Sequence, residues 1–108
     1  MAKTKIETIE EFNQVLEKEN KFILIKHSLT CPISKAAFEE YEQFVAEHEN
    51  VPTYYLYVQE AKELSTYIAE HFEIKHESPQ ALLFEDGKVK WNASHRSITK
   101  QSLVAAGE

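Results

Sequence analysis

A run of four apolar residues, "FILI" at positions 22–25, is the feature that most constrains the fold of this chain. A strand with one face in water alternates apolar and polar side chains, whereas a strand covered on both faces is apolar throughout. Segments with helical periodicity precede and follow the run. We therefore expect residues 22–25 to lie in a central strand of a sheet that carries helices on both faces.

Apolar residues recur at helical spacing in four segments, and four runs have the composition of strands. The helical segments are residues 8–20, 32–48, 60–72 and 97–106, and the strands are residues 21–27, 51–58, 81–85 and 88–91. Thr8 and Glu11 have the spacing of a capping box at the start of the first helix. The expected order is α-β-α-β-α-β-β-α, with space for a short strand near Lys5.

Asp86 and Gly87 separate the last two strands and favour a tight antiparallel hairpin, because both turn residues must reach positive φ. Lys88 and Lys90 alternate with apolar residues in the final strand, as expected at an exposed sheet edge. Strands joined through a helix should lie parallel by a right-handed crossover. The sequence thus predicts one α/β domain over residues 1–108, with a mixed sheet of about four strands.

Composition excludes several functional classes. The formal net charge of −6 over 108 residues argues against a nucleic-acid partner, because domains that bind DNA or RNA usually carry a basic face. No stretch is long and apolar enough to cross a bilayer, and the acidic start has no signal-peptide core. A single cysteine cannot form an internal disulfide framework, and together with the absence of an export signal this indicates the reducing cytoplasm. We also expect a monomer.

That cysteine, Cys31, stands between the apolar strand and the long helix, in the sequence "SLTCPIS". Pro32 favours the first turn of a helix, so the sulfur should lie near the unpaired amides and the positive end of that helix. Such a position stabilises a thiolate, which is the nucleophilic form. Ser34, one turn on, is expected to donate toward the same sulfur. His27 is a candidate source of positive charge, but the sequence does not give its direction.

Beyond this local chemistry, the order of elements, the C-x-x-S motif at Cys31 and the "SPQ" string at residues 78–80 resemble the thioredoxin superfamily over nearly the whole chain. With "TCPIS", residues 30–34, the chain is similar to the monothiol bacilliredoxins of the YtxJ (BrxC) family. The resemblance implies a thioredoxin-like fold. It also implies removal of bacillithiol, a low-molecular-weight thiol, from protein mixed disulfides.

In that resemblance Cys31 is the catalytic residue, and Ser34 replaces the resolving cysteine of a C-x-x-C motif. Cys31 would take bacillithiol from a bacillithiolated client protein, and an external thiol would resolve the adduct. Thr30 and Pro32 are expected to support the site. The Ser78–Pro79 bond is expected to be cis, and Ser78 to offer its backbone to the substrate. Bacillithiol would be a co-substrate, and we expect no tightly bound cofactor.

Other functions stay open on the sequence. The chain would be a non-catalytic thioredoxin-fold adaptor if its thiol were incidental, or a redox sensor if Cys31 were itself capped by bacillithiol. No metal site is expected, because one thiol and scattered histidines do not supply a closed ligand set. Some monothiol glutaredoxins share an iron–sulfur cluster between subunits, but they carry glycine and phenylalanine where this chain has Pro32 and Ile33.

Overall fold

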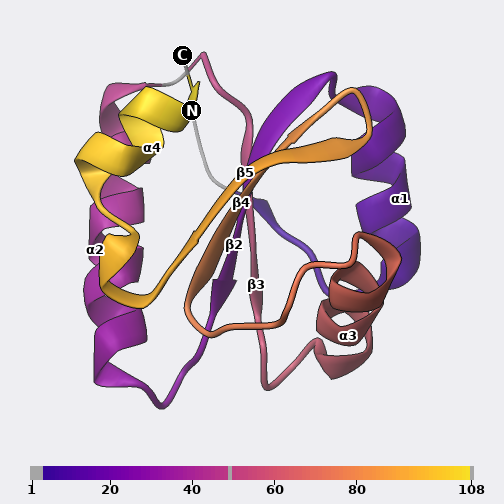
Figure 1. The fold of residues 1–108 in the computed structure, drawn as a ribbon, viewed down its shortest axis with the longest axis horizontal. Helices are drawn as coiled ribbons and strands as arrows, with labels where there is room; N and C mark the ends of the chain where they lie inside the picture. Colours follow the sequence, from indigo (N-terminus) through magenta and orange to yellow (C-terminus); the bar gives the residue numbers. More distant parts are fainter. Residues whose placement is uncertain (1–3, 49, 108) are drawn as a thin grey trace.

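Five strands form one sheet with helices on both faces in the computed structural model, which describes residues 4–48 and 50–107 (Figure 1). In chain order the elements are β1 (Thr4–Lys5), α1 (Ile9–Lys18), β2 (Lys21–His27), α2 (Pro32–Glu47), β3 (Thr53–Tyr57), α3 (Lys62–His71), β4 (Gln80–Glu85), β5 (Lys88–Ser94), the 3₁₀ helix η1 (His95–Ser97) and α4 (Lys100–Gly107). The strand order is β1-β3-β2-β4-β5. The predicted α/β class with a mixed sheet is confirmed, and the short strand near Lys5 is β1.

Strand β2 is the centre of the sheet, as its apolar run predicts. It pairs in parallel with β3, to which α2 connects it, and antiparallel with β4. Leu24 lies beside Tyr54 of β3 and beside Leu82 of β4. The central position of this strand fixes the place at which the following loop and α2 leave the sheet.

The two faces of β2 enter two separate apolar cores. Phe22 and Leu24 pack with residues of α1 and α3, whereas Ile23 and Ile25 pack with residues of α2 and α4. Figure 1 shows α1 and α3 on one side of the sheet and α2 and α4 on the other. Successive side chains of a strand point to opposite faces, so both cores require apolar residues and the run is continuous.

Strands β4 and β5 form the predicted hairpin, and β5 is an edge of the sheet. Asp86 and Gly87 in the turn have φ values of 54° and 77°. Lys88 and Lys90 are exposed, while Val89 and Trp91 between and after them are half-buried. This alternation agrees with the edge position predicted from the sequence.

The last helix begins later than the sequence pattern suggested. We predicted a helix over residues 97–106, but α4 spans Lys100–Gly107 and the 3₁₀ turn η1 precedes it. The reason is local capping: the Ser102 amide donates to Thr99 Oγ1 and the Thr99 amide donates to Ser102 Oγ, both at 3.0 Å. These bonds satisfy amides of the first turn and start the helix after Thr99.

Candidate active site

Three connections meet at one end of the sheet. The parallel strands β2 and β3 both end there, followed by the loops that lead into α2 and α3. Strand β4 is antiparallel to β2 and begins at the same end, with Gln80 opposite Lys26. Pro79, the residue before Gln80, therefore lies beside the end of β2, from which the chain continues to Cys31.

Cys31 is the N-cap residue of α2, and Pro32 occupies its first turn. The thiol is free and half-buried, and its side chain makes no capping hydrogen bond. Its carbonyl accepts the Lys35 amide at 3.1 Å, the first bond of the helix. The amides of a first helical turn have no partners within the helix and carry the positive end of its dipole. The sequence expectation for the position of Cys31 is therefore met.

Ser34 does not make the expected contact with the sulfur of Cys31. Its side chain is fully buried, and its Oγ accepts the Ser28 amide at 2.8 Å. The same oxygen lies 3.0 Å from Nδ1 of His27. Because these two partners occupy the hydroxyl group, Ser34 ties the start of α2 to the end of β2 and to the loop between them.

His27 packs as an aromatic residue beneath this loop. Its ring centroid lies 4.5 Å from that of Phe38 and 5.5 Å from that of Tyr57. Burial lowers the pKa of His27, and a hydrogen bond with Ser34 and the charge of Glu42 offset this only in part. The ring is therefore neutral at neutral pH, and it does not supply the positive charge that the sequence left open.

Gln59, in the β3–α3 loop, holds the segment that precedes Cys31. Its Nε2 donates to Ser28 Oγ at 3.0 Å and to Thr30 Oγ1 at 3.4 Å, and its Oε1 accepts the Leu29 amide at 3.0 Å. Thr30, a predicted site residue, is thus placed in the exposed loop by this contact. Sequence reasoning missed Gln59, and its place directly after a predicted strand was the one available signal.

The Ser78–Pro79 peptide bond is cis, as predicted. The Pro79 carbonyl accepts the His95 amide at 3.0 Å, which links this loop to η1. Ser78 Oγ is buried and has no hydrogen-bond partner in the described part of the chain. The register of β4 against β2 places these two residues at the same end of the sheet as the loop that carries Cys31.

Lys26, on the strand below this end, is a buried cation that the sequence analysis missed. The side chain is fully buried, and Nζ donates to the Ser65 carbonyl at 3.1 Å. Nζ also lies 3.3 Å from Nδ1 of His76. Burial lowers the pKa of Lys26 to about 8, and burial together with the nearby Lys26 charge lowers the pKa of His76.

Residues 4–48 and 50–107 contain neither a metal-binding cluster nor a membrane-spanning helix. No group of three or more histidine, cysteine, aspartate or glutamate side chains in this part is arranged to hold a metal ion. No helix within it has the length and apolar character required to span a membrane.

Comparisons with known proteins agree with this architecture. A solved structure described as a candidate oxidoreductase with a thioredoxin fold is 42% identical, with a TM-score of 0.91 over 97% of this chain and 93% of that one. Mitochondrial thioredoxin 3 of Saccharomyces cerevisiae is 17% identical, with a TM-score of 0.77 over 97% and 92% of the two chains. Thioredoxin of Plasmodium falciparum is 16% identical, with a TM-score of 0.79 over 99% and 100%.

The two thioredoxins are too distant in sequence to show more than the fold, which is thioredoxin-like. Residues 4–103 match the protein family described as monothiol bacilliredoxin BrxC, which covers the site and nearly the whole chain. The chain belongs to the monothiol bacilliredoxin BrxC family.

Proposed function

We propose that the protein removes bacillithiol from protein mixed disulfides by thiol–disulfide exchange at Cys31. One observation carries the proposal: the only thiol of a BrxC-family chain lies half-buried at the N-cap of α2, with its side chain free of capping bonds. A sulfur next to unpaired helix amides is stabilised as the thiolate, which attacks disulfides.

The reaction needs two exchange steps. In the first, the Cys31 thiolate attacks the bacillithiol sulfur of a client–bacillithiol disulfide. A new Cys31–bacillithiol disulfide forms, the old disulfide breaks, and the client leaves as its thiolate, which takes up a proton from solvent. In the second, the thiolate of a low-molecular-weight thiol attacks the bacillithiol sulfur and releases Cys31. Each step exchanges one disulfide for another, so the external thiol is the only reductant required.

Ser34 supports the monothiol character of this cycle. It occupies the position at which a dithiol protein carries its resolving cysteine, and its buried hydroxyl is held by Ser28 and His27. A hydroxyl group cannot attack a disulfide under these conditions. The Cys31–bacillithiol adduct therefore persists until a small thiol reaches it.

The remaining predicted site residues have supporting roles in the proposal. Pro32 opens α2 and fixes the N-cap position of Cys31. Thr30 is held in the preceding loop by Gln59. Ser78 and Pro79 lie at the same end of the sheet, where the backbone of Ser78 is proposed to contact the client. We propose that the protein acts on these clients as a monomer in the cytoplasm.

Two alternatives use the same fold differently. In an adaptor the faces of the domain would bind a protein and the thiol would be incidental. In a sensor Cys31 would accept bacillithiol without passing it on. The half-buried thiol without a capping bond favours exchange chemistry over the adaptor. The chain has no second thiol, which fits both the enzyme and the sensor, so an experiment has to separate these two.

A turnover assay separates the three functions. A bacillithiolated client is incubated with excess bacillithiol and with catalytic amounts of the protein or of Cys31→Ala. The proposal predicts many client thiols released per protein molecule, and none above background with Cys31→Ala. Release limited to one equivalent would support the sensor, and equal release by both proteins would support the adaptor.

A further inference from the structure

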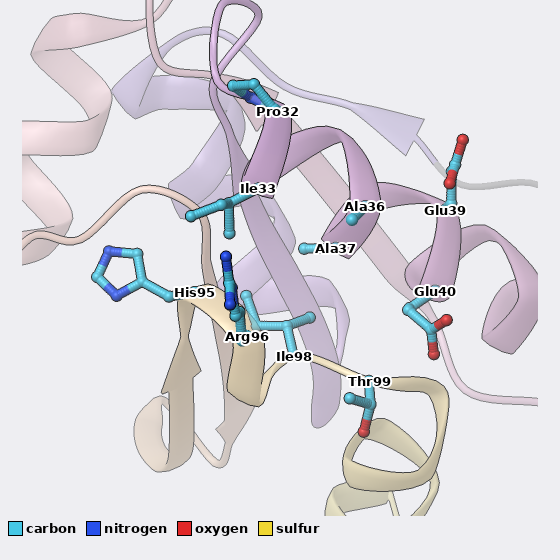
Figure 2. Close-up of a pocket in the computed structure, with 10 residues that line it drawn as sticks. All are labelled: Pro32, Ile33, Ala36, Ala37, Glu39, Glu40, His95, Arg96, Ile98 and Thr99. Atoms are coloured by element: carbon cyan, nitrogen blue, oxygen red, sulfur yellow. The ribbon is translucent and has the colours of Figure 1, made fainter.

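A pocket opens along the first turns of α2 and begins at Pro32, the residue that follows Cys31 (Figure 2). Pro32 and Ile33, the residues that follow Cys31, line one wall, and Ile98 lies on the opposite wall. The pocket has a volume of about 470 Å³. Pockets of this size hold small molecules, and an apolar wall with a few polar groups is typical of them.

The strongest polar feature of the pocket is Arg96. Figure 2 shows its side chain extending from η1 toward Ile33 on α2. It is the only arginine of the chain, and it forms no ion pair with any residue in the described ranges 4–48 and 50–107. A guanidinium group presents several N–H donors in a plane and binds carboxylates in a bidentate manner.

The backbone of η1, from which Arg96 extends, is anchored through His95. His95, the preceding residue, has a φ of 55°, in the left-handed region that residues other than glycine seldom adopt. Its amide donates to the Pro79 carbonyl at 3.0 Å, and its Nε2 lies 3.4 Å from Glu77 Oε1. A costly backbone conformation near a site persists only where surrounding contacts impose it. These contacts therefore fix the backbone of η1, from which the exposed Arg96 side chain extends.

The acidic residues of the pocket do not neutralise Arg96. Glu40 Oε1 accepts the Lys100 amide at 2.8 Å, at the start of α4. Glu39 lies seven residues after Pro32, about two helical turns or ~10 Å further along α2. In Figure 2 both carboxylates lie on the side of the pocket away from His95 and Pro32. Arg96 is the one permanently charged side chain in the lining at the Pro32 end of the pocket.

We propose that this pocket is the subsite for the small-thiol part of the disulfide, and that Arg96 binds its carboxylate. The inference rests on the proposed function, which joins a small thiol to Cys31. A molecule linked to that sulfur occupies the space around Cys31. The pocket begins at Pro32, the next residue, and is therefore within reach of such a molecule. Bacillithiol carries the carboxylates of a malyl group, so its charge complements the unpaired guanidinium group. Arg96 is then a specificity residue for the small thiol and does not act on the client protein.

The first test measures how fast Cys31 accepts a small thiol from two symmetric disulfides, without any client. One is bacillithiol disulfide, and the other is bis(2-hydroxyethyl) disulfide, which has no carboxylate. Arg96→Gln should lower the rate constant for bacillithiol disulfide about tenfold, the effect of one lost charge-assisted hydrogen-bond pair, and leave the other unchanged. Arg96→Lys should restore part of the rate, because it keeps the charge.

Lys88→Gln is the matched control, because it removes one positive charge at the far end of β5, ~20 Å along the strand from η1. It should react like the wild-type protein with both disulfides. An equal loss for both disulfides in Arg96→Gln would overturn the inference, and so would no loss for either.

A second test uses the fact that Arg96 is the only arginine. Phenylglyoxal modifies arginine, and its reaction with the protein is followed by intact mass. The Cys31–bacillithiol disulfide should slow modification several-fold, while the Cys31–hydroxyethyl disulfide should not. Equal rates in both adducts would contradict occupancy of the pocket.

These outcomes are distinct from a failure of the proposed function. A protein that shows Arg96-dependent acceptance of bacillithiol but no turnover of clients keeps the inference and loses the proposed enzyme activity. A protein that turns over clients with no Arg96 effect keeps the activity and loses the inference.

Discussion

Ser34 Oγ lies 3.0 Å from Nδ1 of His27 and accepts the amide of Ser28 at 2.8 Å. The side chain at the second position of the C-x-x-S motif therefore faces the interior and joins α2 to β2. The Cys31 thiol, at the first position of the motif, is free and makes no capping hydrogen bond, whereas the Ser34 hydroxyl has two partners. This division explains how the motif retains its loop geometry without a second thiol.

Ser34→Cys should convert the protein from monothiol to dithiol chemistry. A thiolate one turn after Cys31 can attack the Cys31–bacillithiol disulfide within the molecule, so the adduct should decay without an external thiol. The measurement is the lifetime of the adduct by intact mass after removal of free thiol. Ser34→Ala is the control: it should keep the long-lived adduct and lose about 1 kcal/mol of stability with the hydrogen bonds. An adduct as long-lived in Ser34→Cys as in the wild type would contradict this account.

Gln59→Ala should loosen the segment before Cys31 and leave the rest of the fold intact. The change removes bonds to Ser28, Leu29 and Thr30, all in an exposed region. Hydrogen exchange of the Leu29 amide should accelerate, while the free energy of unfolding changes by less than about 1 kcal/mol. Gln101→Ala, on the exposed face of α4, should change neither quantity. Unchanged exchange at Leu29 would show that Gln59 does not hold the loop.

Features set by neighbouring residues were predictable from the sequence. The capping box of Thr8 and Glu11 is present at α1, and Asp86 and Gly87 make the predicted turn. Cys31 is the N-cap of α2 because Pro32 can open a helix but cannot sit further inside one. Each of these follows from local backbone rules.

Features set by distant residues were not predictable. Lys26 is buried against Ser65 and His76, which are 39 and 50 residues away in the sequence. The position of Arg96 depends on the bond between His95 and Pro79 and on the later start of α4. No pattern in a single sequence specifies such contacts.

Lys26→Met should change how stability depends on alkaline pH. The pKa of Lys26 is about 8 in the folded protein, below the ordinary lysine value of 10.5, so between these two pH values the unfolded chain binds more protons. Stability of the wild type should therefore rise as pH increases through this window, by at most about 1.4 kcal/mol per pH unit. Met has a similar volume and no charge, so this contribution should vanish. Denaturant unfolding at several pH values measures it.

Lys88→Met, at the exposed start of β5, is the control for Lys26→Met and should keep the wild-type slope. Equal slopes in the wild type and Lys26→Met would show that Lys26 is not a desolvated cation. Lys26→Met also loses the contacts with Ser65 and His76. That loss changes the free energy of unfolding by the same amount throughout this pH window, so it does not change the slope.

His27 should titrate below the ordinary histidine value of 6.5, because burial lowers its pKa. As pH falls below 6.5, His27 binds a proton more readily in the unfolded chain than in the folded protein, so the folded protein loses stability. The C2-proton shift of His27 in an NMR titration measures the midpoint directly. His27→Phe identifies the signal by its absence and should weaken the loss of stability in acid. A midpoint above 6.5 would mean that the ring is held as a cation beside the Cys31 loop.

The most direct test of the central claim is the transfer of bacillithiol itself to Cys31. Reduced protein and a client carrying one bacillithiol disulfide are mixed without free thiol and followed by intact mass. The account predicts that the protein gains the mass added by one bacillithiol as the client loses it, and that peptide mapping places the adduct on Cys31. A disulfide between Cys31 and the client, with bacillithiol released to solution, would contradict attack at the bacillithiol sulfur, and absence of any transfer would contradict exchange at Cys31.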